Sequence, residues 1–489
     1  MQSTLDDARK RWILVLTCLA QFMVILDVSV VNVALPSIRT DLGFSAVDLQ
    51  WVVNAYTLTF AGFLLLGGRA ADLLGRQQVF VFGLGLFALA SLVGGLSQSQ
   101  EMLVGARAAQ GIGGAVVAPA TLAIIATTFA EGRERNRALA YWGAMGAVGG
   151  STGVLLGGVL TQLLGWEWIL FINVPVGVLG AVAAMRFIPE STRTVAGERH
   201  FDIAGALSVT AGLVVLTFAI VRTDVNGWGS AQTLLVAAVG AALLVAFVFI
   251  ERRARRPLVP LRIFASRTLT AANLVVFMLG SSVFAMWYFV SLYLQQVLGF
   301  SPIEAGVSFL PMTFAIIVGS TFAGRRAERI GPGRLLAAGM ALISIGMLLF
   351  TRIAPDGSYA SDVLGPGVIT TTGIGLAFVP ATITAVAGVE RSDSGLAGGL
   401  VNTSRQMGGS LGLAILATLA TQRSQALAGG GPIDASALVG GFHRAFFVGA
   451  CFAAVGALTA GLLLVRVRHP AAQQRAQPPA EQPQESAAA

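Results

Sequence analysis

The stretch QFMVILDVSVVNVALPSI, residues 21–38, holds a single carboxylate, Asp27, within a largely apolar run. About 20 apolar residues are enough to cross a membrane as a helix. A charged side chain inside such a helix costs several kcal/mol, so it is rare unless it has a partner or a function. The stretch therefore predicts a transmembrane helix and a candidate site at Asp27.

The composition of the whole chain is that of a membrane protein. Of its 489 residues, 55% are hydrophobic and 11% are charged, whereas a soluble domain carries about 25% charged residues. The net charge of +8 comes from arginines in short loops between apolar runs, so we do not expect nucleic acid as a partner. The chain has no GxxxxGK phosphate-binding loop, and its two cysteines and three histidines are scattered. We therefore expect no direct use of ATP, no metal and no cofactor.

Fourteen apolar runs of spanning length follow one another along the chain. They lie near residues 12–35, 48–70, 78–97, 102–129, 138–163, 168–188, 202–221, 231–250, 268–297, 304–324, 334–352, 363–388, 394–420 and 441–466. The expected fold is all-α and integral to the membrane.

The loop charges predict the orientation of these spans through the positive-inside rule. Arginines gather in the even-numbered loops, for example in GRERNR (132–137), ERRARRPLVPLR (251–262) and GRRAERIGPGR (324–334). The odd-numbered loops hold few. We therefore expect a multi-pass protein of the cytoplasmic (inner) membrane with both termini in the cytoplasm.

The two halves of the chain resemble each other. GFSAVDLQ (43–50) recurs as GFSPIEAG (299–306), and GRAADLLGR (68–76) recurs as GRRAERIGP (324–332). Because each loop recurs on the same side of the membrane, the repeat is parallel, and two such bundles indicate a transporter that rocks about a midplane site. The predicted parts are a cytoplasmic N-terminus (1–11), a six-helix bundle (12–189), a two-span insert with its loops (190–266), a second six-helix bundle (267–467) and a disordered tail (468–489).

Asp27 and a basic residue, Arg107, are expected inside the first bundle. At 1.5 Å per residue, Asp27 lies about 13 Å and Arg107 about 8 Å from the outer ends of their predicted spans. Similar depths allow an ion pair, and movement of Asp27 relative to Arg107 would change its affinity for a proton. We favour a proton-coupling role for both residues over a structural pair or helix cap.

Two glycine-containing segments are candidates for conformational gating. GGRAADLLGRQQVF (67–80) joins spans 2 and 3, and its candidate residues are Gly68, Asp72, Gly75 and Arg76. A turn with positive-inside charge is the alternative. In span 5, Gly146, Gly150, Gly153, Gly157 and Gly158 fall largely on one face, where a partner helix can approach closely. We assign gating to Gly153, Gly157 and Gly158, with helix packing alone as the alternative.

Polar and aromatic residues inside the spans are the candidates for substrate binding. In NTSRQMGGSLG (402–412), Asn402, Arg405 and Gln406 share a helical face, and Arg405 near mid-bilayer requires carbonyls, a distant carboxylate or a ligand as its partner. Structural pairing and substrate contact have equal weight for Arg405. The remaining candidates are Asn32, Tyr56, Gln110, Trp287 and Tyr288, of which the aromatic ones have interfacial positions as their alternative.

Together these segments resemble the fourteen-span drug:proton antiporter family of the major facilitator superfamily, from about residue 12 to residue 466. The similar segments include LDVSVVNVALP (26–36), the loop 67–79, RAAQGIGGA (107–115) and NTSRQMGGSLG. The resemblance implies a proton-coupled, monomeric exporter of lipophilic small molecules, with Asp27 at the acidic position of span 1 and Arg107 at the arginine associated with proton movement. Val154 stands where the family's span 5 motif has proline, which weakens the inference of export over uptake.

A proton symporter that imports a metabolite is the main alternative, and a membrane-embedded lipid-modifying enzyme is a remote one. The Gly-rich face of span 5 favours export, and the sequence offers no His/Asp or Cys/His constellation for an enzyme. A single membrane acid fits a monovalent cation or a neutral compound as the exported substrate.

Overall fold

The computed structural model describes residues 6–130, 133–190, 202–254, 257–387, 389 and 393–465, so the predicted tail lies outside the described residues. Within these ranges the regular structure is helical, with no strand. Thirteen helices of the described residues are long and apolar enough to cross a membrane. The all-α transmembrane fold expected from the sequence is confirmed.

The first half of the chain forms one bundle. Its helices are α1 (Asp7–Leu42), α2 (Trp51–Leu74), α3 (Arg76–Gly95), α4 (Gln100–Thr128), α5 (Arg133–Leu163), and the short α6 (Trp168–Phe171) with α7 (Asn173–Phe187). Inside this bundle α1 packs on α5, α2 and α3 pack on α4, and α3 packs on α7. The helices α8 (Ile203–Asn226) and α9 (Ala231–Arg253) follow as a hairpin.

The second half repeats the packing plan of the first. Its helices are α10 (Arg267–Leu292), α11 (Pro302–Ser308), α12 (Leu310–Ile330), α13 (Pro332–Phe350), α14 (Gly365–Ala387), α15 (Ser394–Ala428) and α16 (Ala435–Thr459). Here α10 packs on α15, α12 and α13 pack on α14, and α13 packs on α16. Equivalent helices make equivalent contacts, as a parallel repeat requires.

Two helices differ from the spans expected from the sequence. Helix α1 runs past Pro36 to Leu42 and ends at Gly43 in the left-handed conformation (φ 66°). Proline disrupts only its own turn of a helix, so α1 extends beyond the predicted span. Helix α15 has 35 residues but is absent from the thirteen apolar helices because Asn402, Arg405 and other polar residues lower its hydropathy. It packs against α2, α8, α10 and α16, which shield it from lipid.

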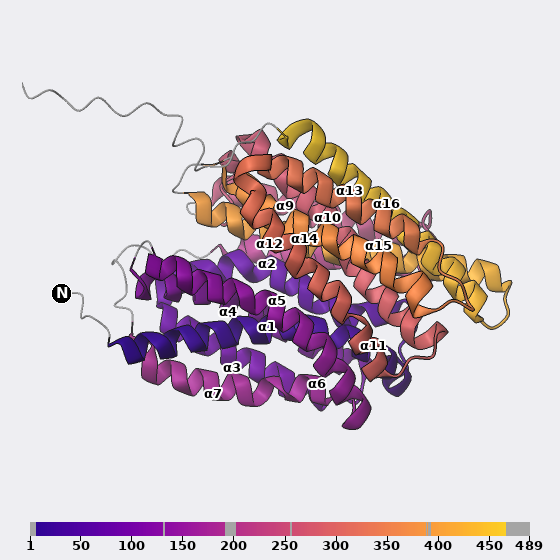
Figure 1. Cartoon of the computed structure of the whole chain (residues 1–489), viewed down its shortest axis with the longest axis horizontal. Coiled ribbons are helices and arrows are strands. Elements are labelled where there is room, and N and C mark those ends of the chain that lie inside the picture. The colour runs from indigo at the N-terminus through magenta and orange to yellow at the C-terminus, as the bar shows by residue number, and fades with distance from the viewer. Residues whose placement is uncertain are drawn as a thin grey trace, which may run out of the picture.

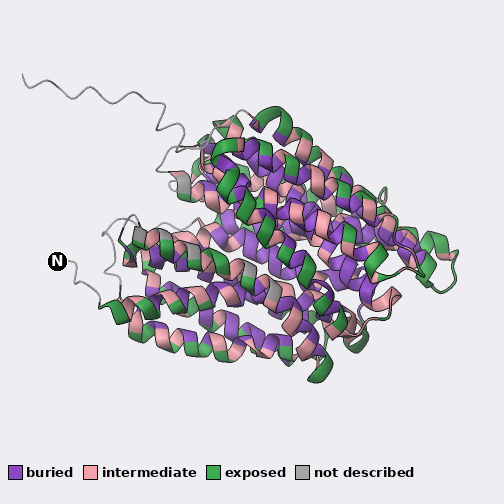
Figure 2. Cartoon of the chain, viewed as in Figure 1, coloured by how far each residue is buried: buried purple, intermediate pink, exposed green. Residues whose placement is uncertain are grey.

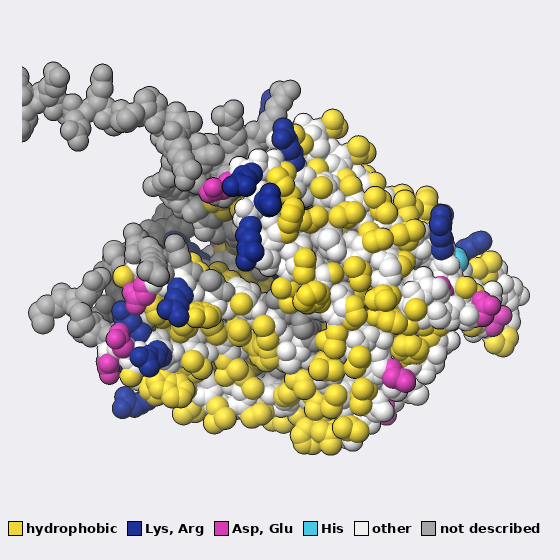
Figure 3. Space-filling view, in the orientation of Figure 1, with side chains coloured by type: hydrophobic (Ala, Val, Ile, Leu, Met, Phe, Trp, Pro, Cys, Tyr) yellow, Lys and Arg dark blue, Asp and Glu magenta, His cyan; other side chains and the backbone are white. Residues whose placement is uncertain are grey.

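The two bundles meet at one end of the molecule and diverge at the other. We call the end at which α1 begins the N-terminal face and the opposite end the far face. Towards the far face, Ser291 donates a hydrogen bond to the main-chain oxygen of Asn32 (2.7 Å), and the Ile303 N–H donates to Gln162 (3.1 Å). On the side of the N-terminus the ribbons diverge, and the space-filling surface is hollowed between the bundles (Figures 1 and 3). The molecule is therefore open towards its N-terminal face.

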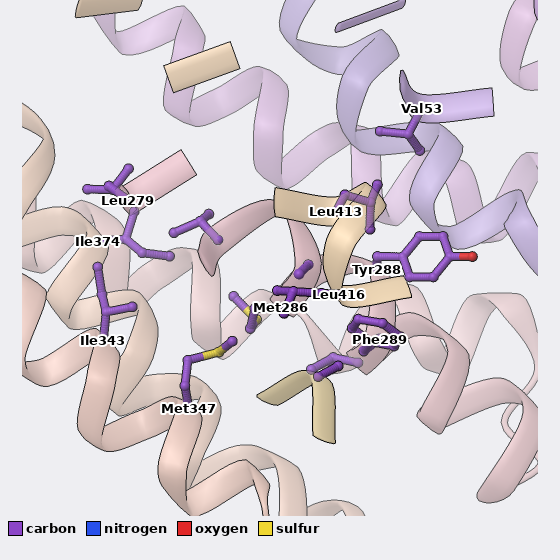
Figure 4. Close-up of a cluster of buried hydrophobic side chains, with 14 of the residues drawn as sticks. Val53, Leu279, Met286, Tyr288, Phe289, Ile343, Met347, Ile374, Leu413 and Leu416 are labelled. Atoms are coloured by element: carbon purple, nitrogen blue, oxygen red, sulfur yellow. The ribbon is translucent and has the colours of Figure 1, made fainter. Parts of the chain in front are cut away.

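Buried apolar side chains fill the space inside each bundle, and exposed apolar ones cover its outside (Figures 2 and 3). A cluster that includes Met286, Phe289 and Met347 holds α10, α13, α14, α15 and α16 together and continues to Val53 of α2 in the first bundle (Figure 4). On the outside, helix α9 exposes Leu234, Leu235 and Phe249. Such apolar outer faces are suited to the hydrocarbon of a bilayer rather than to water.

Candidate functional site

An ion pair between Asp27 and Arg107 lies inside the first bundle. The Arg107 guanidinium donates through Nη1 to Asp27 Oδ2 at 2.5 Å. Asp27 is 0% and Arg107 2% exposed, so neither charge is in contact with water at either face. The pairing expected from the sequence is present, although α1 is longer than expected and Asp27 lies fifteen residues, about 22 Å, before its end.

Two amide side chains donate hydrogen bonds to the second carboxylate oxygen of Asp27. Gln110 donates to Oδ1 at 3.1 Å, and Asn173, the first residue of α7, donates to the same atom at 2.9 Å. The Gln110 amide also donates to Ser91 at 2.7 Å. The structure thus places Gln110 in this buried network, away from the space between the bundles.

Sequence analysis did not single out Asn173 or Ser91. Asn173 lies in the segment WEWILFINVPVG (166–177), and the only signal in that segment is an amide within an apolar run. Both residues are almost fully buried, and buried polar side chains are hydrogen-bonded as a rule. A search for polar residues inside predicted spans would have found them, but not their partner.

Arg107 is also held by helix α2. Its Nε donates to the main-chain oxygen of Val52 at 3.0 Å, its Nη1 donates to Gln110 at 2.9 Å, and its guanidinium lies 4.5 Å from the ring centroid of Tyr56. Tyr56 is 0% exposed. Helices α1, α2, α3, α4 and α7 therefore meet at one charged network.

The junction of α2 and α3 has the tight turn expected from its glycines. Gly75 has φ 105°, a conformation that favours glycine, and α3 begins at the next residue, Arg76. Gly68 lies beside Pro119 of α4, which is 3.5 Å from the point where a Cβ would stand. The side chain of Asp72 lies outside the described residues.

The glycines of α5 divide among three surroundings. Gly153 and Gly157 lie against α1, where an added Cβ would be 2.8 Å from Leu26 O and 2.7 Å from Val30 O. Gly158 lies against Pro302 of α11, in the other bundle, and Gly146 faces open space. The expectation of one packed face is wrong for Gly146. The glycines of α5 that pack tightly against α1 are Gly149, Gly153 and Gly157, which follow one another at helical spacing. Among the described glycines of α5, Gly158 is the one that lies against a residue of the second bundle.

The polar residues of α15 have few partners. Arg405 donates through Nη2 to the side-chain oxygen of Asn402 at 2.6 Å, and its guanidinium lies 4.8 Å from the centroid of Phe378 on α14. Gln406 is buried, and only 5% of its surface is exposed. Next to them, Ser410 and Thr57 of α2 share a hydrogen bond across the bundle boundary.

The structure does not gather the aromatic candidates into one pocket. Tyr56 lies in the first bundle beside Arg107, whereas Tyr288 is buried in the second bundle with its ring edge-on to Phe289 at 5.2 Å. Trp287, on the preceding position of α10, packs on Phe309, with their ring centroids 5.0 Å apart. Asn32 donates to Val28 O of its own helix at 3.2 Å and lies at the junction of α1 and α10.

Comparisons with known proteins agree with this architecture. The family model of the Major Facilitator Superfamily matches residues 17–413. The chain is 43% identical over 408 residues to the cephamycin export protein CmcT of Amycolatopsis lactamdurans, which covers 83% of this chain and 84% of the relative. It is 40% identical over 455 residues to the puromycin resistance protein pur8 of Streptomyces alboniger, covering 92% and 90%.

Two solved structures share the fold. One is a bacterial homologue of the human lysosomal transporter Spinster, in an inward-facing and unoccupied conformation, with a TM-score of 0.69, 17% identity and coverage of 97% of this chain and 100% of that chain. The other is the POT family transporter PepTSo, with a TM-score of 0.67, 14% identity and coverage of 94% and 98%. At these identities the likeness concerns the fold alone.

Proposed function

The chain belongs to the major facilitator superfamily, and we propose that it is a proton-coupled antiporter that exports lipophilic drugs, dyes or antibiotics across the cytoplasmic membrane. Members of this superfamily are transporters of small molecules and not enzymes. Export is supported by the relatives, one of which is named as an export protein and another as a resistance protein. The protein works as a monomer in this proposal.

The N-terminal face is the cytoplasmic face in this proposal. Arg69, Arg186, Arg252 and Arg325 lie at helix ends on the same side as the start of α1. The positive-inside rule places arginine-rich short loops in the cytoplasm. The hollow between the bundles then opens inward, and both termini are cytoplasmic.

The buried pair of Asp27 and Arg107 is the observation on which proton coupling rests. A carboxylate inside the hydrocarbon layer that is paired with an arginine and two amides is stable while ionised, and it is the type of group that relays protons in transporters. We propose that Asp27 receives a proton from outside when the bundles open outward. Release of that proton to the cytoplasm restores the pair seen here, and the inward-open carrier then binds its substrate.

The contact between α5 and α11 serves as the outer gate in this proposal. Gly158 packs on Pro302, and Gly306 packs on Val154, so the two bundles touch through main chain at the far face. Such close contacts break as a unit when two bundles rock apart. The drive is sufficient, because each pH unit supplies about 1.4 kcal/mol per proton and each 100 mV about 2.3 kcal/mol per charge.

The experiment that tests this function is proton release from energised inside-out vesicles. A panel of dyes and antibiotics is added to vesicles with the wild-type protein and with Asp27→Asn. Substrate-dependent release with the wild type alone is the expected result. Equal release with both proteins would exclude Asp27 from the proton path, and proton movement in the same direction as the substrate would indicate a symporter.

A further inference from the structure

Arg405 is a charged side chain of the second bundle for which the described residues provide no carboxylate partner. It lies eleven residues into α15, about 17 Å from the start of that helix. No ion pair among the described residues includes it, and its Nε is buried without a hydrogen-bond partner. Its one hydrogen bond in the described part of the chain is with the neutral Asn402. A guanidinium has five N–H donors, so most of its binding capacity is unused.

The face of α15 that carries Arg405 is open at its N-terminal end and closed beyond Arg405, where a Cβ added at Gly409 would lie 2.7 Å from the ring of Phe284. Gly395 and Gly398 share this face with Asn402 and Arg405 at helical spacing, and no atom lies within 4 Å of a Cβ added at either glycine. The other sides of α15 are covered, for example by Phe277 of α10 at Gly408 and by α2 and α8. The open positions lie in the first turns of α15, on the side of the N-terminal face.

An aromatic ring completes the surroundings of the guanidinium. Phe378, under the guanidinium, is 44% exposed, and its helix α14 packs mainly against α12 and α13 of its own bundle. A planar guanidinium binds a carboxylate with two parallel hydrogen bonds. An exposed ring beside it offers an apolar surface to the body of the same molecule.

We propose that Arg405, together with Asn402 and Phe378, is the subsite for a carboxylate group of the exported molecule. The inference deepens the proposed export function and rests on it. It differs from the expectation of a cationic or neutral substrate, because the membrane acid on which that expectation depended is occupied by Arg107, Gln110 and Asn173.

The charge of the substrate changes what drives the cycle. Export of a monovalent anion in exchange for one entering proton moves two positive charges inward, whereas export of a monovalent cation moves none. Each charge that crosses 100 mV supports a gradient of about fifty-fold, so two charges support one of about 2,500-fold. When the membrane potential is collapsed and the pH gradient is kept, the gradient that the carrier can hold should therefore fall steeply for an anion and stay unchanged for a monovalent cation.

The first test measures binding to the purified full-length protein in nanodiscs of zwitterionic lipid, which exclude an anionic lipid headgroup as the ligand. The probes are pyrenebutyrate, its methyl ester and the corresponding trimethylammonium compound, which share one apolar body. We expect pyrenebutyrate to bind at least about tenfold more tightly than the ester, a difference of about 1.4 kcal/mol. Arg405→Gln should reduce this ratio to about one, and Arg405→Lys should keep part of it.

The matched control is Arg222→Gln. Arg222 also lies over a phenylalanine, with its guanidinium 5.4 Å from the centroid of Phe218, but in the α8–α9 hairpin outside both bundles. This variant should keep the full preference for the carboxylate. If Arg405→Gln does not fold, Asn402→Ala replaces it and should reduce the ratio by several-fold.

Three results would overturn the inference. These are equal or tighter binding of the ester or the ammonium compound by the wild type, no binding of any probe, and an unchanged preference in Arg405→Gln. Proton-coupled export of a cation that Arg405→Gln leaves intact would also exclude the carboxylate subsite but keep the proposed function. Selective binding of pyrenebutyrate without any coupled proton movement would support the subsite and exclude proton antiport.

Discussion

The two bundles have the same helix packing but hold their interior arginines differently. In the first bundle, Arg107 has a carboxylate, an amide, a main-chain oxygen and a tyrosine ring around it. In the second, Arg405 has one amide oxygen and one phenylalanine ring. A repeat can preserve the way helices pack while the side chains on them acquire different tasks. Here the first arginine has a carboxylate partner, and the second has none among the described residues.

The largest effect is expected from Asp27→Asn. Transport coupled to protons should fall to background, because an amide cannot carry the proton. The free energy of unfolding should also fall by about 3–5 kcal/mol, because Arg107 then stays buried without its counter-charge. Proton release from vesicles and thermal unfolding of the purified protein measure the two effects separately.

The double variant Asp27→Asn, Arg107→Gln separates stability from coupling. It removes both charges, so most of the lost stability should return while coupled transport stays absent. If the double variant transports normally, the pair has only a structural role and the contrast between the bundles loses its functional meaning.

A large effect on conformation is expected from Gly158→Val. A side chain at this position would collide with the main chain of Pro302 and hold the far face open. Labelling of cysteines introduced near the far face should rise about tenfold, and transport should stop. Gly146→Val is the matched control on the same helix, since an added Cβ at Gly146 meets no atom within 4 Å. Equal labelling of both variants would mean that the α5–α11 contact is not the gate.

Asn173→Ala and Asn402→Ala compare the two arginine networks directly. Asn173 is 1% exposed and donates to a buried carboxylate, so its loss should cost about 1–3 kcal/mol of stability. Asn402 is only partly buried, so water can replace it, and its loss should cost less than about 1 kcal/mol. Thermal unfolding of both variants checks the order. The reverse order would mean that the network of Arg405, and not that of Arg107, is the one shielded from water.

The smallest effect is expected outside both networks, at the surface pair of Lys10 and Glu134. Lys10 donates to Glu134 at 2.9 Å, and this hydrogen bond lowers the pKa of the Glu134 carboxyl. A lowered carboxyl pKa contributes stability that is present at neutral pH and is lost as the pH falls through that pKa. Lys10→Gln should leave transport unchanged at neutral pH and reduce this small acid dependence of the unfolding temperature, because the Ala130 N–H still donates to Glu134. Strong loss of transport in Lys10→Gln would contradict this prediction, because it would mean that the Lys10–Glu134 pair takes part in the transport cycle.

Much of the fold could be predicted because lipid imposes simple rules on a sequence. Runs of about 20 apolar residues, arginines in alternate loops and the repeated segments 43–50 and 299–306 locate the spans and the two bundles without any knowledge of packing. Helix α15 was predicted in spite of its polar residues because it lies between clear neighbours. Asp27 and Arg107 could be paired because few charged residues have similar depth.

The sequence by itself determined that the chain is a bundle of membrane helices with an acid and an arginine inside its first half. The tertiary structure alone decided that Gln110 and Asn173 complete the carboxylate site, that Gly149 and not Gly146 lies against α1, and that Arg405 lies beside Phe378. The physical reason is that hydropathy depends on each segment alone. A helix face acquires its partners only when segments as far apart as residues 27 and 173 are brought together.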